Sequence, residues 1–145
     1  MTIGRQIKWD FETNGDLKIK DKNGKLIYWE TSNGIWEKRE YDSKGKEIYL
    51  ENSDGYWAKR EYDSKGNQIY FENSDRDWIK QEYDSDGNEI YYESSSGYWS
   101  KWEYDSEGDI IYFEDSDGVI EDHRPKPCEV KIVEIEGVKY KLTKV

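Results

Sequence analysis

Short segments that alternate hydrophobic and polar residues fill most of the chain, and turn signals separate them. The segments WAKREY at 57–62 and QIYFEN at 68–73 are typical, with aromatic and β-branched residues at regular intervals. Such residues favour strands, and the runs between turn signals are too short for helices. The pattern therefore predicts an all-β protein built from hairpins.

This pattern repeats every 21 residues. Four regular units with the same residue types at fixed offsets span residues 32–52, 53–73, 74–94 and 95–115. A degenerate repeat, here called a worn unit, precedes them at 14–31, and the segment WDFET before it resembles half a unit. A partial unit follows at 116–123. A fixed period near 20 residues is typical of stacked repeats. We predict one repeat sheet over residues 1–123, with worn units at 7–31 and regular units at 32–115.

The pattern fails after Gly118. Pro125 and Pro127 cannot donate to a strand ladder. The segment VKIVEIEGVKYKLTKV that follows has Gly137 between two apolar stretches. Residues 124–145 are therefore predicted to form a proline-containing linker and a C-terminal hairpin.

Each unit contains two turns that differ in their residues. The segment from Asp63 to Gly66 suits a type I turn followed by a left-handed glycine, whereas Asp54-Gly55 suits a two-residue type I′ turn. Because the period is odd, two turns of one type would put successive units on opposite faces of the sheet. The mixed turns predict that the repeat tryptophans share a face with the row Leu50-Lys59-Phe71-Lys80-Tyr92, and that the other face carries the row Tyr49-Arg60-Tyr70-Gln81-Tyr91-Trp102-Tyr112.

Composition limits the thickness of this sheet. Hydrophobic residues make up 34% of the chain and charged residues 38%, which excludes a thick two-layer core. Aromatic residues make up 16%, which disfavours disorder. We therefore expect an elongated, twisted antiparallel meander of a single layer, in which aromatic rings and the stems of charged side chains cover one another. A curled β-roll and two copies packed face to face as a homodimer are the alternatives.

Residues that usually carry catalysis or bind metals are scarce. The chain has one Cys, Cys128, and one His, His123, which excludes an internal disulfide framework and a zinc cluster. A Ser or Cys nucleophile needs a His base, and paired carboxylates say little in a chain with 33 acidic residues. We predict no enzymatic activity, no metal and no cofactor.

The sequence gives no indication of membrane insertion or export. No apolar run approaches the ~20 residues of a membrane helix. The start MTIGRQIKWD lacks the apolar segment of a signal peptide. The expected location is the cytoplasm, that of the host cell if a phage encodes the chain.

Negative charge is concentrated in one stretch of the chain. The formal net charge is -11, and residues 74–123 contain 3 basic and 16 acidic side chains. Nucleic-acid binding needs a basic surface, so the expected partner is a basic protein surface, such as that of a nucleic-acid-binding protein, and not nucleic acid itself. The predicted partner-binding residues are Asp75, Asp77, Glu82, Asp84, Asp86, Glu89, Glu93, Glu103, Asp105, Glu107 and Asp109.

The tryptophans that recur in the regular units give a second hypothesis. Aromatic rings on every second strand can stack on sugar rings or enclose a quaternary ammonium. The same rings can instead supply the apolar area that holds the hairpins together. The first reading makes the chain an aromatic platform for glycans or choline-like ligands, formed by Trp36, Trp57, Trp78 and Trp99.

The stretch EYDSKGNQIYFENSDR at 61–76 resembles the YD repeats of Rhs-type and teneurin-type proteins. The matching residues are Tyr62, Asp63, Gly66, Asn67 and Ile69, and the likeness extends over residues 14–122. The resemblance implies tandem hairpins, in families that build large shells and carry their enzymes elsewhere.

Other likenesses concern the type of protein. The motif Ile90-Tyr91-Tyr92 is similar to choline-binding and glucan-binding repeats, and MORN-type repeats are more loosely similar. Acidic repeat proteins that end in a segment like VEIEGVKYKL resemble phage accessory proteins, some of which inhibit bacterial defence. The hypothesis is therefore a non-enzymatic protein-binding module, for example a phage-type, anti-CRISPR-like inhibitor that blocks a nucleic-acid-binding surface.

Overall fold

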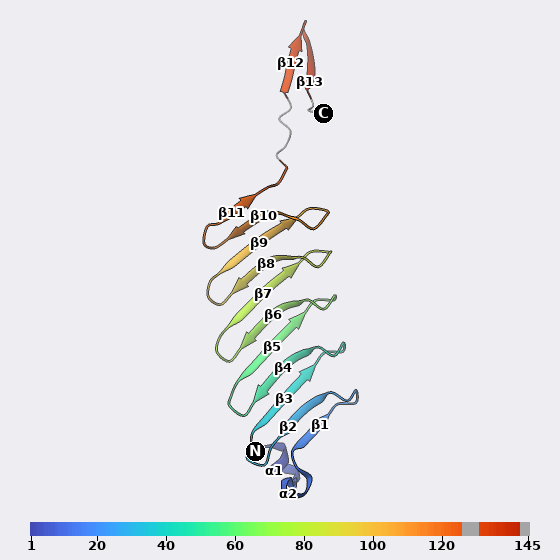
Figure 1. The fold of residues 1–145 in the computed structure, drawn as a ribbon, viewed down its shortest axis with the longest axis vertical. Coiled ribbons are helices and arrows are strands. Elements are labelled where there is room, and N and C mark those ends of the chain that lie inside the picture. The colour runs from blue at the N-terminus through green and yellow to red at the C-terminus, as the bar shows by residue number, and fades with distance from the viewer. Residues whose placement is uncertain (126–130, 143–145) are drawn as a thin grey trace.

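The computed structural model describes residues 1–125 and 131–142. Eleven strands form one open antiparallel sheet in which each strand pairs with the next along the chain, from β1 to β11 (Figure 1). The predicted meander of tandem hairpins is thereby confirmed, and the strands do not close into a roll. Its strands are β1 (Leu17–Lys20), β2 (Leu26–Glu30), β3 (Trp36–Tyr41), β4 (Glu47–Asn52), β5 (Trp57–Tyr62), β6 (Gln68–Asn73), β7 (Trp78–Tyr83), β8 (Glu89–Ser94), β9 (Trp99–Tyr104), β10 (Ile110–Asp115) and β11 (Ile120–Asp122).

A separate two-stranded sheet follows the meander. Strands β12 (Lys131–Ile135) and β13 (Val138–Leu142) pair as an antiparallel hairpin around Glu136 and Gly137. Part of the predicted linker, at 126–130, and the last residues, 143–145, lie outside the described residues.

The N-terminal segment differs from the prediction, because the sheet begins at Leu17 and not at residue 7. Two short helices, α1 (Ile3–Ile7) and α2 (Phe11–Asn14), stand where the worn units were expected to begin. Asp10 caps α2 by accepting the backbone N–H groups of Glu12 and Thr13 at 3.1 and 3.2 Å. The segment WDFET is therefore a capped helical turn and not half a hairpin.

The two turns of each unit are of the same type, so the predicted mixture of turns is wrong. The N–H of Asn52 donates to the carbonyl of Tyr56 at 3.0 Å, as Asp63 donates to Asn67 at 2.9 Å, and a glycine with positive φ precedes each acceptor. The side chain of Asn52 also accepts the N–H groups of Asp54 and Tyr56 at 3.0 and 3.1 Å. These bonds widen the expected two-residue loop to three residues.

A β-bulge in every unit keeps the faces of successive units aligned. In the hairpin of β5 and β6, Glu61 pairs with Tyr70 and Tyr62 pairs with Gln68, which leaves Ile69 as an extra residue. One extra residue per unit restores the parity that two identical turns would break. The bulge residues are Ile27, Ile48, Ile69, Ile90 and Ile111.

The bulge also changes the neighbours of each tryptophan strand. Lys59 lies opposite Tyr49 and Glu72, while Arg60 lies opposite Phe71. The predicted rows Leu50-Lys59-Phe71 and Tyr49-Arg60-Tyr70 are therefore wrong. We call the face that carries Trp36, Trp57, Trp78 and Trp99 the Trp face; it also carries Tyr49, Tyr70, Tyr91 and Tyr112.

The opposite face is the more apolar one and is held by contacts between neighbouring strands. It carries Phe71, Ile79 and Phe113, and Trp102 packs on Phe113 with ring centroids 5.8 Å apart. Tyr104 donates its hydroxyl proton to the carbonyl of Glu89 at 2.9 Å, and Tyr62 donates to the carbonyl of Glu47 at 3.1 Å. Stability therefore arises from bonds between neighbouring strands.

One buried hydroxyl on the opposite face predicts a stabilising substitution. Ser100 is 1% exposed, and its Oγ has no hydrogen-bond partner among the described residues. Ala58, 0% exposed, holds the same place two units earlier. Ser100→Ala is expected to raise the free energy of unfolding by about 1 kcal/mol, because an unsatisfied buried polar group is removed. Urea denaturation measures this change.

The matched control is Ser94→Ala. Ser94 Oγ lies 2.8 Å from Ser96 Oγ, so this variant loses a bond and is expected to be no more stable than the wild type. Loss of stability in Ser100→Ala would contradict the prediction.

Candidate functional site

The Trp face carries a regular arrangement of aromatic, basic and acidic side chains. In three units the lysine two residues after the tryptophan lies over its ring: Nζ of Lys59 is 5.1 Å from the centroid of Trp57, and Nζ of Lys80 is 5.0 Å from that of Trp78. Lys59 Nζ also lies 3.1 Å from Oε1 of Glu72 on the next strand. The lysines thus bridge tryptophans and glutamates across strands.

The predicted tryptophan ladder exists, with all four rings half-buried on this face. Trp36 stacks on Tyr28 at 6.3 Å between centroids. Lys101 Nζ lies 5.0 Å from the Trp99 ring, so Trp57, Trp78 and Trp99 each have a cation of the same chain over them. An external quaternary ammonium would have to displace these lysines.

Cross-strand pairs of a glutamate and a tyrosine recur beside the ladder. We call them Glu–Tyr notches: Glu40–Tyr49, Glu61–Tyr70, Glu82–Tyr91 and Glu103–Tyr112. A hollow of about 610 Å³ includes Glu61 and Tyr70, and its equivalent 21 residues later, about 510 Å³, includes Glu82 and Tyr91. The Trp face therefore repeats one hollow along the sheet.

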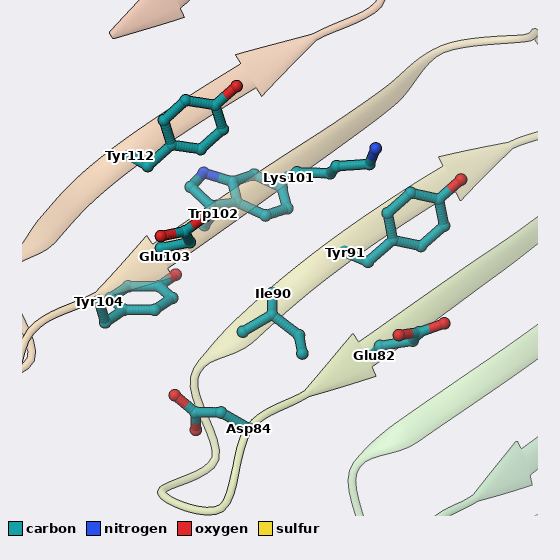
Figure 2. Close-up of a pocket in the computed structure, with 9 residues that line it drawn as sticks. All are labelled: Glu82, Asp84, Ile90, Tyr91, Lys101, Trp102, Glu103, Tyr104 and Tyr112. Carbon is teal, nitrogen blue, oxygen red and sulfur yellow. The ribbon is translucent and has the colours of Figure 1, made fainter. Parts of the chain in front are cut away.

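Figure 2 shows the second of these hollows. Glu82 on β7 and Tyr91 on β8 lie on adjacent strands, with Lys101 and Tyr112 further along the sheet. Burial raises the pKa of Tyr91 above its ordinary value, and the charges of Glu93 and Glu82 raise it further. Tyr91 therefore stays protonated at neutral pH and presents a neutral ring.

The two outer notches are filled by cationic side chains of the chain itself. Lys38 Nζ lies 2.6 Å from Oε1 of Glu40 and 5.6 Å from the Tyr49 ring. The Arg124 guanidinium lies 4.1 Å from the Tyr112 ring, and its Nη1 is 3.2 Å from Oε1 of Glu103. Among residues 1–125 and 131–142, the structure shows no such ion pair for Glu61 or Glu82.

The predicted acidic residues do not form one patch. Five lie in two neighbouring turns at one end of the strands, two lie in a turn at the opposite end, and Glu89 accepts a hydrogen bond from Gln81 Nε2 at 2.6 Å. Only Glu82, Asp84 and Glu103 line a common hollow. The residues in the first two turns are Asp84, Asp86, Asp105, Glu107 and Asp109, those in the turn at the opposite end are Asp75 and Asp77, and those on the Trp face are Glu82, Glu93 and Glu103.

Lysine bridges join the turns of the earlier units, a feature that the sequence reasoning missed. Lys44 Nζ donates to the carbonyl of Ser64, Lys65 Nζ donates to that of Ser85, and Lys46 Nζ donates to that of Gly66 at 2.6 Å. The places equivalent to Lys44 and Lys65 are held by Asp86 and Glu107 in the later units. The signal was present in the sequence as a change from lysine to acid at one repeat position.

The turn carboxylates themselves have structural partners. The Asp84 side chain accepts hydrogen bonds from the Asn88 amide and from backbone N–H groups, and these lower the pKa of Asp84. Arg124 lowers the pKa of Asp122 to about 2. These carboxylates are therefore ionised at neutral pH and contribute full negative charge.

The described residues hold no group of three or more His, Cys, Asp or Glu side chains arranged to bind a metal. His123 is exposed, and its backbone N–H donates to Ile111 at 2.8 Å. Cys128 lies outside the described residues. Within the described ranges, no helix has the length and apolar character needed to span a membrane.

Comparisons with known proteins identify the architecture. No protein-family model matches the chain, and no curated protein matches it. Among solved structures, it is similar to the complex of TcdB2, TccC3 and Cdc42, with a TM-score of 0.52 and 17% identity over 69% of this chain and 5% of that one. The chain has a YD-repeat-like fold.

Two further structures share this fold. The TcdB2–TccC3 structure gives a TM-score of 0.51 and 18% identity over 70% of this chain and 6% of that one. The Photorhabdus luminescens Tc holotoxin pore gives 0.51 and 18% over 70% of this chain and 5% of that one. The chain thus spans only a small fraction of these proteins, and at this identity the similarity concerns the fold alone.

Proposed function

We propose that the chain is a non-enzymatic protein-binding repeat module whose acidic half engages a basic protein surface. The observation that carries this proposal is the replacement of the bridging lysines. Where Lys44 and Lys65 bond the next turn, Asp86 and Glu107 form no such bond among the described residues. At these two places, acidic side chains thus add negative charge where the earlier units have a bridging lysine.

The charge distribution supports this proposal. Residues 74–123 form β7 to β11 and contain 3 basic against 16 acidic side chains. An open sheet presents these groups on its faces and edges, where they attract a basic partner within about one Debye length, roughly 8 Å at physiological salt. Basic nucleic-acid-binding surfaces have the complementary chemistry, so the proposed role is an inhibitor of the phage type that covers such a surface.

The test is capture of host proteins by the immobilised full chain and by a neutralised variant. The neutralised variant carries Asp→Asn and Glu→Gln substitutions at Asp75, Asp77, Glu82, Asp84, Asp86, Glu89 and Glu93. Asn preserves the turn caps, since Asn52 and Asn73 cap equivalent turns. The wild type is expected to capture a basic protein. Added salt is expected to release that protein, and so is the nucleic acid that it normally binds. The neutralised variant is expected not to capture it.

A control outside the acidic half and a charge reversal separate binding from folding. Neutralising Glu12, Asp16 and Asp54, which are exposed outside residues 74–123, is expected to leave capture unchanged. Asp86→Lys is expected to restore a bridge to the turn at 105–109 and to raise thermal stability while weakening capture. A partner retained equally by the neutralised variant, or no basic partner at all, would refute the proposal.

A further inference from the structure

We infer that the two central notches, Glu61–Tyr70 and Glu82–Tyr91, each bind an arginine side chain of the partner. This inference rests on the proposed function and specifies how the basic surface is recognised. It predicts two arginines in one extended segment lying across β5 to β8.

The outer notch at the C-terminal end shows the binding mode within the chain itself. The Arg124 guanidinium lies 4.1 Å from the Tyr112 ring, contacts Glu103 at 3.2 Å, and is also held by Asp122 at 2.8 Å. Glu103 and Tyr112 form the same cross-strand pair as Glu82 and Tyr91, one unit later. A planar guanidinium suits this place, because it stacks on an aromatic ring while donating to a carboxylate.

The central notches have the same glutamate and tyrosine, with Lys80 and Lys101 at the place that Asp122 holds opposite Tyr112, and without such an occupant among the described residues. Lys80 and Lys101, the neighbouring basic side chains, have their Nζ atoms 5.0 Å from the rings of Trp78 and Trp99. Glu61 and Glu82 are exposed. The two hollows, of about 610 and 510 Å³, are large enough for an arginine side chain.

The charges of these hollows complement a cation. Glu61, Asp63 and Glu82 line the first hollow together with one basic residue, Lys80. Glu82, Asp84 and Glu103 line the second with Lys101. In the corresponding hollow of the first unit, which Ile3 of α1 also lines, Ile19 holds the place of Glu61. That hollow is lined by two carboxylates, Asp21 and Glu40, and two basic side chains, Lys38 and Arg39, so the excess of acidic over basic groups belongs to the later hollows.

The spacing of the notches sets the spacing of the arginines. Equivalent residues of successive units lie two strands apart, and the register shifts them by two residues along the strand. With about 4.8 Å between strands and about 3.3 Å per residue, the notches lie about 12 Å apart. An extended chain places residues i and i+4 on one side about 13 Å apart, which matches this distance.

The experiment measures binding of synthetic peptides to the full chain by calorimetry. The probe is Thr-Arg-Thr-Ser-Thr-Arg-Thr, and its scrambled control Thr-Thr-Arg-Arg-Thr-Ser-Thr has the same charge with adjacent arginines. The double variant Glu61→Gln with Glu82→Gln is expected to bind the probe about tenfold more weakly than the wild type, since two ion pairs are lost. The scrambled peptide is expected to bind several-fold more weakly than the probe.

An outer notch and α2 supply the control. Glu40→Gln with Glu12→Gln also removes two charges, one from the notch that Lys38 fills and one from α2, both outside the two central hollows, and is expected to change probe binding less than twofold. Arg124→Ala is expected to strengthen binding of a peptide with three arginines at this spacing several-fold, because it opens a third notch. Equal losses in the two double variants, or no preference for the spaced probe, would overturn the inference.

The captured host partner distinguishes this inference from the proposed function. If the Glu61→Gln, Glu82→Gln variant still captures the basic partner at wild-type strength, the notch assignment fails and the proposed function stands. If the wild type captures no basic partner, the proposed function itself fails.

Discussion

Replacing Glu30 by Ala is expected to lower the free energy of unfolding by about 3 kcal/mol and to release α1 from the sheet. Glu30 is 2% exposed, and its carboxylate accepts bonds from Thr2 Oγ1 at 2.5 Å, the Gly4 N–H at 2.7 Å and the Tyr28 hydroxyl at 2.8 Å. Bonds to a charged acceptor contribute about 1.5–3 kcal/mol each when buried, and their loss is partly offset by water. Chemical denaturation followed by circular dichroism measures the effect.

Two further variants test the mechanism of this prediction. A Cβ at Gly4 would lie 2.8 Å from Phe11 Cζ and 2.9 Å from both Glu30 carboxylate oxygens, so Gly4→Ala is expected to release α1 as well. Glu51→Ala changes the equivalent residue of the next unit, which is half-buried, and is expected to cost less than about 1 kcal/mol. Equal costs for Glu30→Ala and Glu51→Ala would contradict the proposed role of α1.

The same contact predicts a dependence on pH. Burial raises the pKa of Glu30, but the hydrogen bonds from Thr2, Gly4 and Tyr28 outweigh it, and the pKa is lowered overall. A lowered pKa contributes stability above the unfolded value of about 4.3, and this contribution is lost as pH falls through the folded value. The stability difference between wild type and Glu30→Gln is therefore expected to persist at pH 7 and to shrink below about pH 4.

Deleting residues 53–73, one whole unit, is expected to leave a shorter sheet that still unfolds cooperatively. The deletion joins β4 to β7 and places Glu51 opposite Trp78 and Tyr49 opposite Lys80. These pairs match Glu72 with Trp78 and Tyr70 with Lys80 in the intact chain. Because each strand pairs only with its neighbours, the urea m-value is expected to fall by about a fifth, in proportion to the surface that is lost.

A deletion half as long is the control and is expected to be more damaging. Removing residues 53–62 deletes β5 and puts β6 beside β4. Both of these are the second strand of a unit, and each carries a glutamate that normally faces a tryptophan. The pairs of Trp57 with Glu51 and of Lys59 with Glu72 are then lost, and parity with the next unit breaks. Loss of near-ultraviolet dichroism is expected. A half-unit deletion that folds as well as the whole-unit deletion would contradict the repeat register.

The candidate site could be predicted only in part. Its residue types can be read from one stretch of sequence, but its geometry depends on how neighbouring strands pair. The sequence located the acid-rich half, including Glu82 and Asp84, which line one hollow. It did not pair Glu82 with Tyr91, since that pairing depends on the bulge at Ile90. The bulge in turn follows from side-chain bonds that set the loop length, such as those of Asn52, and these bonds are not visible in a hydrophobic pattern.

The sequence by itself determined the hairpin repeat, the strand of each unit that begins at its tryptophan, the shared face of the four tryptophans and the uneven charge. These properties follow from a period and from residue types, which act locally. Only the tertiary structure decided which tyrosine meets which glutamate, how Lys44 and Lys65 bridge successive turns, and how α1 buries Glu30. Each of these depends on a register between strands, where a shift of one residue moves a side chain to the other face.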